Sequence, residues 1–190
     1  MGTSLCIVGF QRGCTSLVHS ICAKATGLKT PNTPAGEIFS KSPENNEPSR
    51  NTELPDYTKD KRWYGDVRRV MDLYRGGWVV KDVYQPFLVR KYAMENPGAF
   101  NFIFVDRPIQ HVRSRQAATG FTAAGVPDPT ELKPAYLGYR RGDVGKLLFN
   151  PREIFDALCE LGYEINEYDY RTPEFLAKRK KTLMSFRGVQ

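Results

Sequence analysis

The stretch from Leu5 to Thr26 constrains the fold more than any other part of the chain. It opens on an apolar run with β-branched members, continues through a loop with two glycines, and ends in apolar residues at helical spacing. This pattern predicts a buried strand, a tight loop and an amphipathic helix. Gly9 and Gly13 permit a close backbone turn, and Arg12 adds a positive charge beside the unpaired amide groups at the helix start. Such a turn suits a phosphate or a sulfate.

The length of 190 residues and the composition, 41% hydrophobic and 26% charged, predict one well-buried domain over residues 1–190. Two stretches rich in turn-forming residues, about 40–58 and 120–135, are predicted as flexible loops. The sequence has no signal-peptide pattern and no apolar run long enough to cross a bilayer, so we expect a cytoplasmic protein that does not enter membranes. The oligomeric state stays open.

The net charge of +7 implies attraction to anions, and it leaves nucleic acid, an anionic surface or a polyanionic cosubstrate as partners. The one dense basic run, Lys178 to Lys181, is interpreted as a solvated helix face, which makes nucleic acid an unlikely partner. The cysteines lack metal-ligand spacing and are predicted to be reduced thiols; they are Cys6, Cys14, Cys22 and Cys159. No metal site is expected.

Strand and helix patterns alternate along the rest of the chain. Strands are predicted at 36–39, 78–83 and 102–105, with an edge strand at 163–168. Helices are predicted at 60–74, 85–95, after Pro108, at 151–161 and from Thr172 onward. This alternation is typical of a doubly wound, mostly parallel α/β sheet, in which ligands bind beyond the carboxyl ends of the strands.

The loop is not a Walker A motif. Only three residues separate Gly9 from Gly13, whereas the motif needs four, and Cys14 follows in place of the Lys-Ser/Thr pair. A site for ATP or GTP would therefore lack its lysine.

The loop residues 11–17 resemble the 5′-phosphosulfate loop of the sulfotransferases, with Arg, Thr, hydroxyl and Leu positions matched. A second resemblance lies where the apolar strand 102–105 ends: the turn carries Pro108, and Ser114 follows six residues later, as in the 3′-phosphate site of that family. On these motifs the chain resembles a short member of the sulfotransferases that use 3′-phosphoadenosine 5′-phosphosulfate (PAPS), closer to the bacterial and Golgi types than to the cytosolic ones. The resemblance implies an α/β three-layer sandwich with a central, mostly parallel sheet, similar to P-loop NTPases.

The resemblance also implies an activity: in-line transfer of a sulfuryl group from PAPS to a hydroxyl or amine of an unknown small-molecule or glycan acceptor. Arg12 would stabilise the leaving phosphate, Glu37 would act as the general base, and Lys81 would help to neutralise the transferring group. The residues implied in binding the cosubstrate are Arg12, Gly13, Cys14, Thr15, Ser16, Arg107, Ser114 and Arg115.

Other interpretations remain open from the sequence. One is a P-loop-like nucleotide kinase, against which the missing lysine counts. Another is a non-catalytic module that binds a nucleotide or a nucleic acid. His111 is an alternative base to Glu37, and His19 is interpreted as a packed or surface histidine rather than a catalyst.

Overall fold

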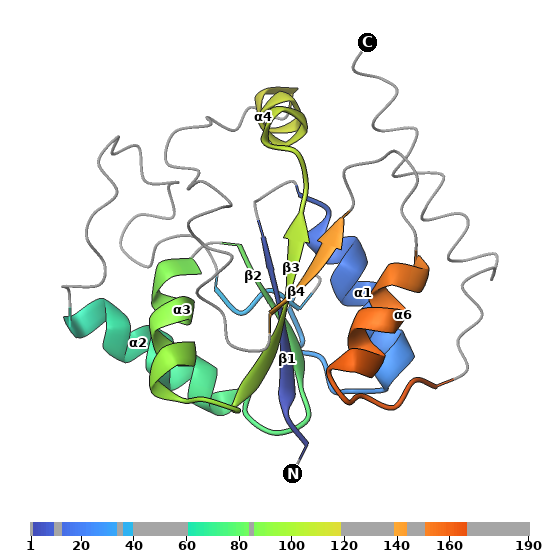
Figure 1. Cartoon of the computed structure of the whole chain (residues 1–190). Helices are drawn as coiled ribbons and strands as arrows, with labels where there is room; N and C mark the ends of the chain where they lie inside the picture. Colours follow the sequence, from blue (N-terminus) through green and yellow to red (C-terminus); the bar gives the residue numbers. More distant parts are fainter. Residues whose placement is uncertain are drawn as a thin grey trace.

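A four-stranded parallel sheet organises the protein, whose computed structural model describes residues 2–9, 13–33, 36–39, 61–83, 86–118, 139–143 and 151–166. The strands are β1 (Ser4–Gly9), β2 (Val79–Asp82), β3 (Phe100–Asp106) and β4 (Tyr139–Asp143). Their order across the sheet is β2-β1-β3-β4. All neighbours are parallel, so the carboxyl ends of the strands lie at one edge, the upper edge in Figure 1.

The middle of the sheet is apolar on both faces because β1 and β3 are covered on both sides. In the register, Leu5 lies opposite Val79 of β2 and Asn101 of β3. The side chains from Leu5 to Val8 are completely buried. Continuous apolar runs of this kind are expected for strands covered by helices on both faces, so the predicted central strand at 102–105 is confirmed and extends from Phe100 to Asp106.

Helices cover the two faces of the sheet and make three layers (Figure 1). One face packs against α1 (Thr15–Thr26) and α6 (Pro151–Glu160), and the other against α2 (Lys61–Leu73) and α3 (Pro86–Glu95). The remaining helix of the described residues, α4 (Ile109–Ala118), stands beyond the carboxyl ends of the strands. The predicted fold class, an α/β three-layer sandwich with a central parallel sheet, is thereby confirmed.

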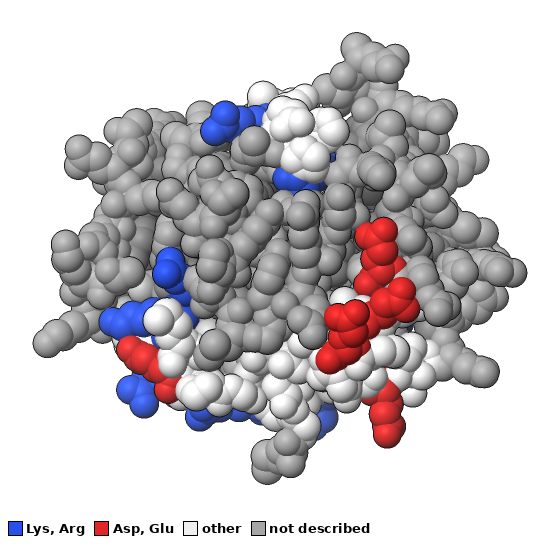
Figure 2. Space-filling view, viewed as in Figure 1, with Lys and Arg blue, Asp and Glu red and all other residues white. Residues whose placement is uncertain are grey.

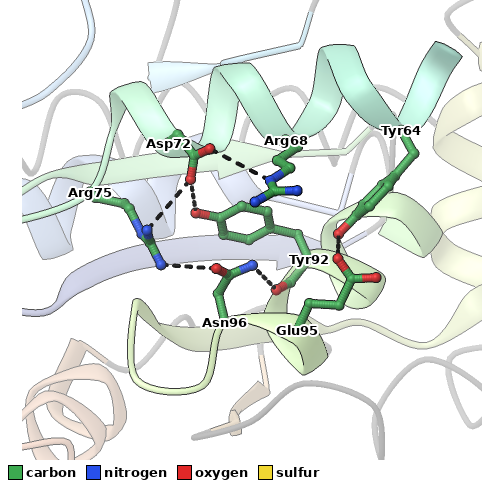
Figure 3. Close-up of polar contacts among 7 residues, drawn as sticks. All are labelled: Tyr64, Arg68, Asp72, Arg75, Tyr92, Glu95 and Asn96. Carbon is green, nitrogen blue, oxygen red and sulfur yellow. Dashed lines mark hydrogen bonds and ion pairs between the residues drawn. The ribbon is translucent and has the colours of Figure 1, made fainter. Parts of the chain in front are cut away.

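A polar network joins α2 to α3 on the outer side of the molecule (Figure 3). The Tyr92 hydroxyl donates a hydrogen bond of 2.6 Å to Asp72, and Arg75 lies 3.6 Å from the same carboxylate. Arg75 also donates to the side chain of Asn96 at 3.0 Å. The network adds polar contacts between the two helices to the apolar packing that Tyr92 shares with Val67 and Met71.

Two predicted strands differ from the structure, and one strand was not predicted. The segment 36–39 is not a full strand, because Glu37 makes a single parallel bridge to Lys81 of β2. The described part of the predicted edge strand, 163–166, is not in strand conformation, and the Tyr163 hydroxyl there donates to the Thr3 carbonyl oxygen at 3.1 Å. The sheet instead gains β4, which no strand pattern predicted.

The predicted loops at 40–58 and 120–135 and the basic helix from Thr172 lie outside the described residues. Among the described helices, none has the length and apolar character that a membrane span needs. The single domain over residues 1–190 and the cytoplasmic location stay predictions.

Candidate functional site

The candidate site lies at the carboxyl edge of the sheet, where the loop after β1 leads into α1. Cys14 precedes the helix in the left-handed conformation, with φ of 70°, and makes no side-chain cap. Its carbonyl oxygen accepts hydrogen bonds from the amides of Leu17 and Val18. The first amides of the helix therefore point out of its N-terminus without a capping side chain, which favours a bound anion.

The backbone conformation of Cys14 changes the register in which the loop is read. Four residues, 10–13, separate Gly9 from Cys14, so Cys14 occupies the place of the second glycine of a Walker A motif. Its positive φ is the conformation that glycine adopts most easily. In this register Thr15 replaces the lysine and Ser16 keeps the hydroxyl. Counting the loop from Ser16 backward would have found this from the sequence.

The start of α1 lies close to the end of β1. A Cβ atom at Gly9 would lie 2.9 Å from the Thr15 methyl group and 3.1 Å from the carbonyl oxygen of Val105. Thr15 is buried, so its side chain packs against the end of β1 instead of reaching outward as a lysine would. Gly13 is buried as well, and the predicted residue Arg12 lies outside the described residues.

A lysine from the neighbouring strand reaches the helix start. Lys81, in β2, donates a hydrogen bond of 3.1 Å from Nζ to Ser16 Oγ. The same ammonium lies 3.2 Å from Glu37 Oε2, and the two side chains are only 10% and 12% exposed. Lys81 therefore links α1, β2 and the 36–39 segment at a nearly buried point.

Glu37 has an environment suited to proton transfer. Burial raises its pKa, the charge of Asp82 raises it further, and Lys81 lowers it, with a net result of about 8. Asp82 itself is completely buried. A general base works best when its pKa lies near the operating pH, so this carboxylate has the properties of one.

Arg107 approaches the loop from the end of β3. It is 7% exposed, and its guanidinium donates a hydrogen bond of 3.6 Å to Cys14 Sγ. Burial lowers the pKa of the Arg107 guanidinium. Burial raises the pKa of the Cys14 thiol, and the positive charges of Arg107 and Arg115 counteract this rise. A second positive charge therefore lies beside the loop.

The remaining predicted residues are on α4. Arg115 is half-buried and close enough for its charge to act on Cys14, whereas Ser114 is exposed. None of the contacts among the described residues joins Ser114 to the loop. The structure thus brings together the loop, Lys81, Glu37 and Arg107, and it leaves Ser114 apart.

Charge is unevenly spread over the face seen in Figure 2. Acidic side chains gather over α6, whose exposed members include Glu153, Asp156 and Glu160. Basic side chains lie both near α4 at the top and over the lower left of the view. Those near α4 lie beyond the carboxyl ends of the strands, where positive charge favours an anionic ligand. Within the described ranges, no three His, Cys, Asp or Glu side chains come together as a metal-binding group.

Comparisons with known proteins were made by sequence and by structure. No protein-family model matches the chain, and no curated protein matches it by sequence. By structure it is similar to a sugar kinase from Janibacter sp. HTCC2649, with 17% identity, a TM-score of 0.58, and 86% of this chain and 96% of the other covered. It is also similar to a gluconokinase from Sinorhizobium meliloti 1021, with 20% identity, a TM-score of 0.54, and coverage of 85% and 91%. These similarities show the P-loop NTPase-like fold.

The interpretation as a PAPS-dependent sulfotransferase is wrong on this comparison, because the matching structures are sugar kinases. The prediction of PAPS as cosubstrate is wrong for the same reason. The physical reason is that a strand, an anion-binding loop and a positively charged turn serve any phosphate on a parallel sheet. The motifs at 11–17 and around Pro108 are therefore typical of anion sites in general and do not indicate which group is transferred.

Proposed function

We propose that the protein is a P-loop-like kinase that transfers the γ-phosphoryl group of a magnesium–nucleoside triphosphate to a hydroxyl of a small, sugar-like acceptor. The fold shared with two sugar kinases supports this proposal. The main objection is the missing lysine of the loop, since that lysine contacts the β- and γ-phosphates in Walker A proteins. The proposal therefore depends on another cation at the same place.

The observation that carries the proposal is the hydrogen bond of 3.1 Å from Lys81 to Ser16. It brings an ammonium group from β2 to the N-terminus of α1, where the phosphates would lie. Lys81 would then supply the charge that Thr15 does not. Arg107, beside Cys14, would contribute a second charge on the other side of the loop.

The reaction follows from these positions. The acceptor oxygen attacks the γ-phosphorus, the bond from that phosphorus to the bridging oxygen breaks, and the nucleoside diphosphate leaves with the bonding electrons. Loop amides and Lys81 stabilise the negative charge on the transferring group and the leaving phosphate. Magnesium arrives with the nucleotide as part of the substrate and neutralises phosphate charge. The acceptor proton passes to a carboxylate oxygen of Glu37, whose raised pKa suits it to accept the proton.

Calorimetric titration with magnesium–ATP tests the nucleotide site, and release of ADP in the presence of a panel of sugars, sugar acids and polyols tests the transfer. Lys81→Met should weaken magnesium–ATP binding about tenfold or more, which corresponds to a loss of about 1.4 kcal/mol. Lys29→Met is the matched control, because Lys29 is exposed and lies near Trp78, at the start of β2.

Ser16→Ala removes only the hydroxyl to which Lys81 donates and provides a second, milder variant. Absence of magnesium–ATP binding by the wild-type protein would overturn the proposal. Equal affinity of the wild type, Lys81→Met and Ser16→Ala would remove Lys81 from the phosphate site.

A further inference from the structure

Gly36 lies directly against the ring of His19, a residue of α1. Its φ is +69°, and a Cβ atom built on it would be 2.0 Å from His19 Nε2 and 2.4 Å from Cε1. Real side chains do not approach so closely. The position therefore requires glycine for two reasons, the left-handed backbone and the imidazole behind it.

The imidazole is itself held in place. His19 is 4% exposed, and its Nε2 lies 3.2 Å from the carbonyl oxygen of Val79 in β2. A carbonyl oxygen only accepts, so Nε2 carries a proton and donates it. One ring thus joins the second turn of α1 to the backbone of β2 and presents a fixed surface to Gly36.

The surface matters because Glu37 is the next residue. The backbone amide of Ile38 donates to the Lys81 carbonyl oxygen at 3.1 Å, and Glu37 bridges Lys81 in parallel register. Gly36 directly precedes this short pairing and packs against the His19 ring. A shift of the Gly36 backbone would therefore move the Glu37 carboxylate relative to Lys81.

We infer that His19 is a positioning residue of the candidate site: its imidazole, bonded to Val79 and packed on Gly36, fixes the Glu37 carboxylate beside Lys81. The groups that face this carboxylate come from three elements: Lys81 and Asp82 of β2, Cys6 of β1, and Ser16 through Lys81 from α1. The geometry stands without the proposed kinase activity. Its role in phosphoryl transfer rests on that proposal.

The test is the titration of Glu37, followed by carbon NMR of its carboxyl group and assigned by the signal that Glu37→Gln removes. Gly36→Ala should push the segment off the ring and admit water. Because burial is the largest cause of the raised pKa, the pKa should then fall by about one unit or more. Gly98→Ala is the matched control, since Gly98 also has a positive φ, of 80°, but its added Cβ atom meets nothing within 4 Å.

The variant His19→Ala tests the ring itself. It removes the hydrogen bond to the Val79 carbonyl oxygen and the surface on which Gly36 packs, so the pKa of Glu37 should fall as it does in Gly36→Ala. Urea denaturation of each variant separates this local effect from a general loss of stability. A titration of Glu37 equal to that of the wild type in either His19→Ala or Gly36→Ala would overturn the inference.

The same measurement distinguishes this inference from the proposed function because it needs no nucleotide. If the wild type binds no magnesium–ATP while the pKa of Glu37 moves as expected, the positioning role stands and the kinase proposal fails. If transfer to an acceptor is found, Gly36→Ala should lower kcat with little change in the KM for magnesium–ATP, because Lys81 and the loop remain.

Discussion

Removing the ionisable group of Glu37 should make stability less sensitive to alkaline pH. Its pKa of about 8 in the folded protein lies above the ordinary value of 4.5. A raised pKa means that the folded state holds the proton more tightly than the unfolded chain does. Glu37 therefore stabilises the fold fully below about pH 4.5, and this contribution is lost as the pH rises to about 8.

The magnitude follows from the two pKa values. Each pKa unit corresponds to about 1.4 kcal/mol, so between pH 5.5 and pH 8.5 the wild type should lose about 3 kcal/mol of unfolding free energy through Glu37. The variant Glu37→Gln keeps the shape of the side chain and has no such loss. Its stability relative to the wild type should therefore improve by about 3 kcal/mol over this interval.

Urea denaturation at several pH values measures this difference directly, with the slope m checked for constancy. Glu153→Gln, at an exposed position on α6, is the control for the change in net charge. A difference between the wild type and Glu37→Gln that stays constant within about 1 kcal/mol from pH 5.5 to pH 8.5 would refute the reasoning.

Three other substitutions have expected outcomes. Gly9→Ala places a methyl group against Thr15 and the backbone of β3, so it should cost about 1 to 3 kcal/mol of stability in urea denaturation and weaken magnesium–ATP binding in calorimetry. Cys14→Gly removes the cost of a left-handed conformation and should raise the unfolding free energy by about 1 kcal/mol; a loss of stability would show that the Arg107 contact matters more. Tyr92→Phe removes the hydrogen bond to Asp72 and should cost about 1 kcal/mol while magnesium–ATP binding stays at the wild-type value.

The sequence predicted the sheet well where burial dictated residue type. The runs that became β1 and β3 are largely apolar because helices cover both faces, and such runs can be recognised directly. β2 was recognised from its opening residues, Val79 and Val80. β4 escaped prediction because its sequence, Tyr-Arg-Arg-Gly-Asp, carries three charges and a glycine in five residues. It lies at the edge of the sheet, where neighbouring backbone and not apolar periodicity determines the pairing.

The residues of the candidate site could be selected from the sequence, but their contacts could not. Lys81 and Ser16 drew attention because they lie at the end of a predicted strand and the start of a predicted helix, and Glu37 because it resembles the general base of the sulfotransferases. The Lys81 ammonium contacts both Ser16 and Glu37 because of the register of β2 against β1 and the single bridge at Glu37. Both are long-range features.

His19 was interpreted as a packed or surface histidine, and its burial agrees with the first of these alternatives. What the sequence could not reveal is the glycine that lies against the ring, because Gly36 is separated from His19 by most of a helix and a turn. The sulfotransferase interpretation failed for a related reason: short loops report the charge of a ligand, whereas its identity depends on parts of the site far apart in sequence.

The place of β1 in the middle of the sheet has a consequence for how the chain is made. On the ribosome, β1 emerges before both of its partners, since residues 10–78 separate it from β2 and β3 follows later still. Until synthesis reaches Val79, the four side chains from Leu5 to Val8, which are completely buried in the native protein, have no partner strand, and until it reaches Asp106 they have only one of the two. The nascent chain therefore exposes this apolar segment while residues 10–78 are made, the period in which protection by a chaperone would matter most.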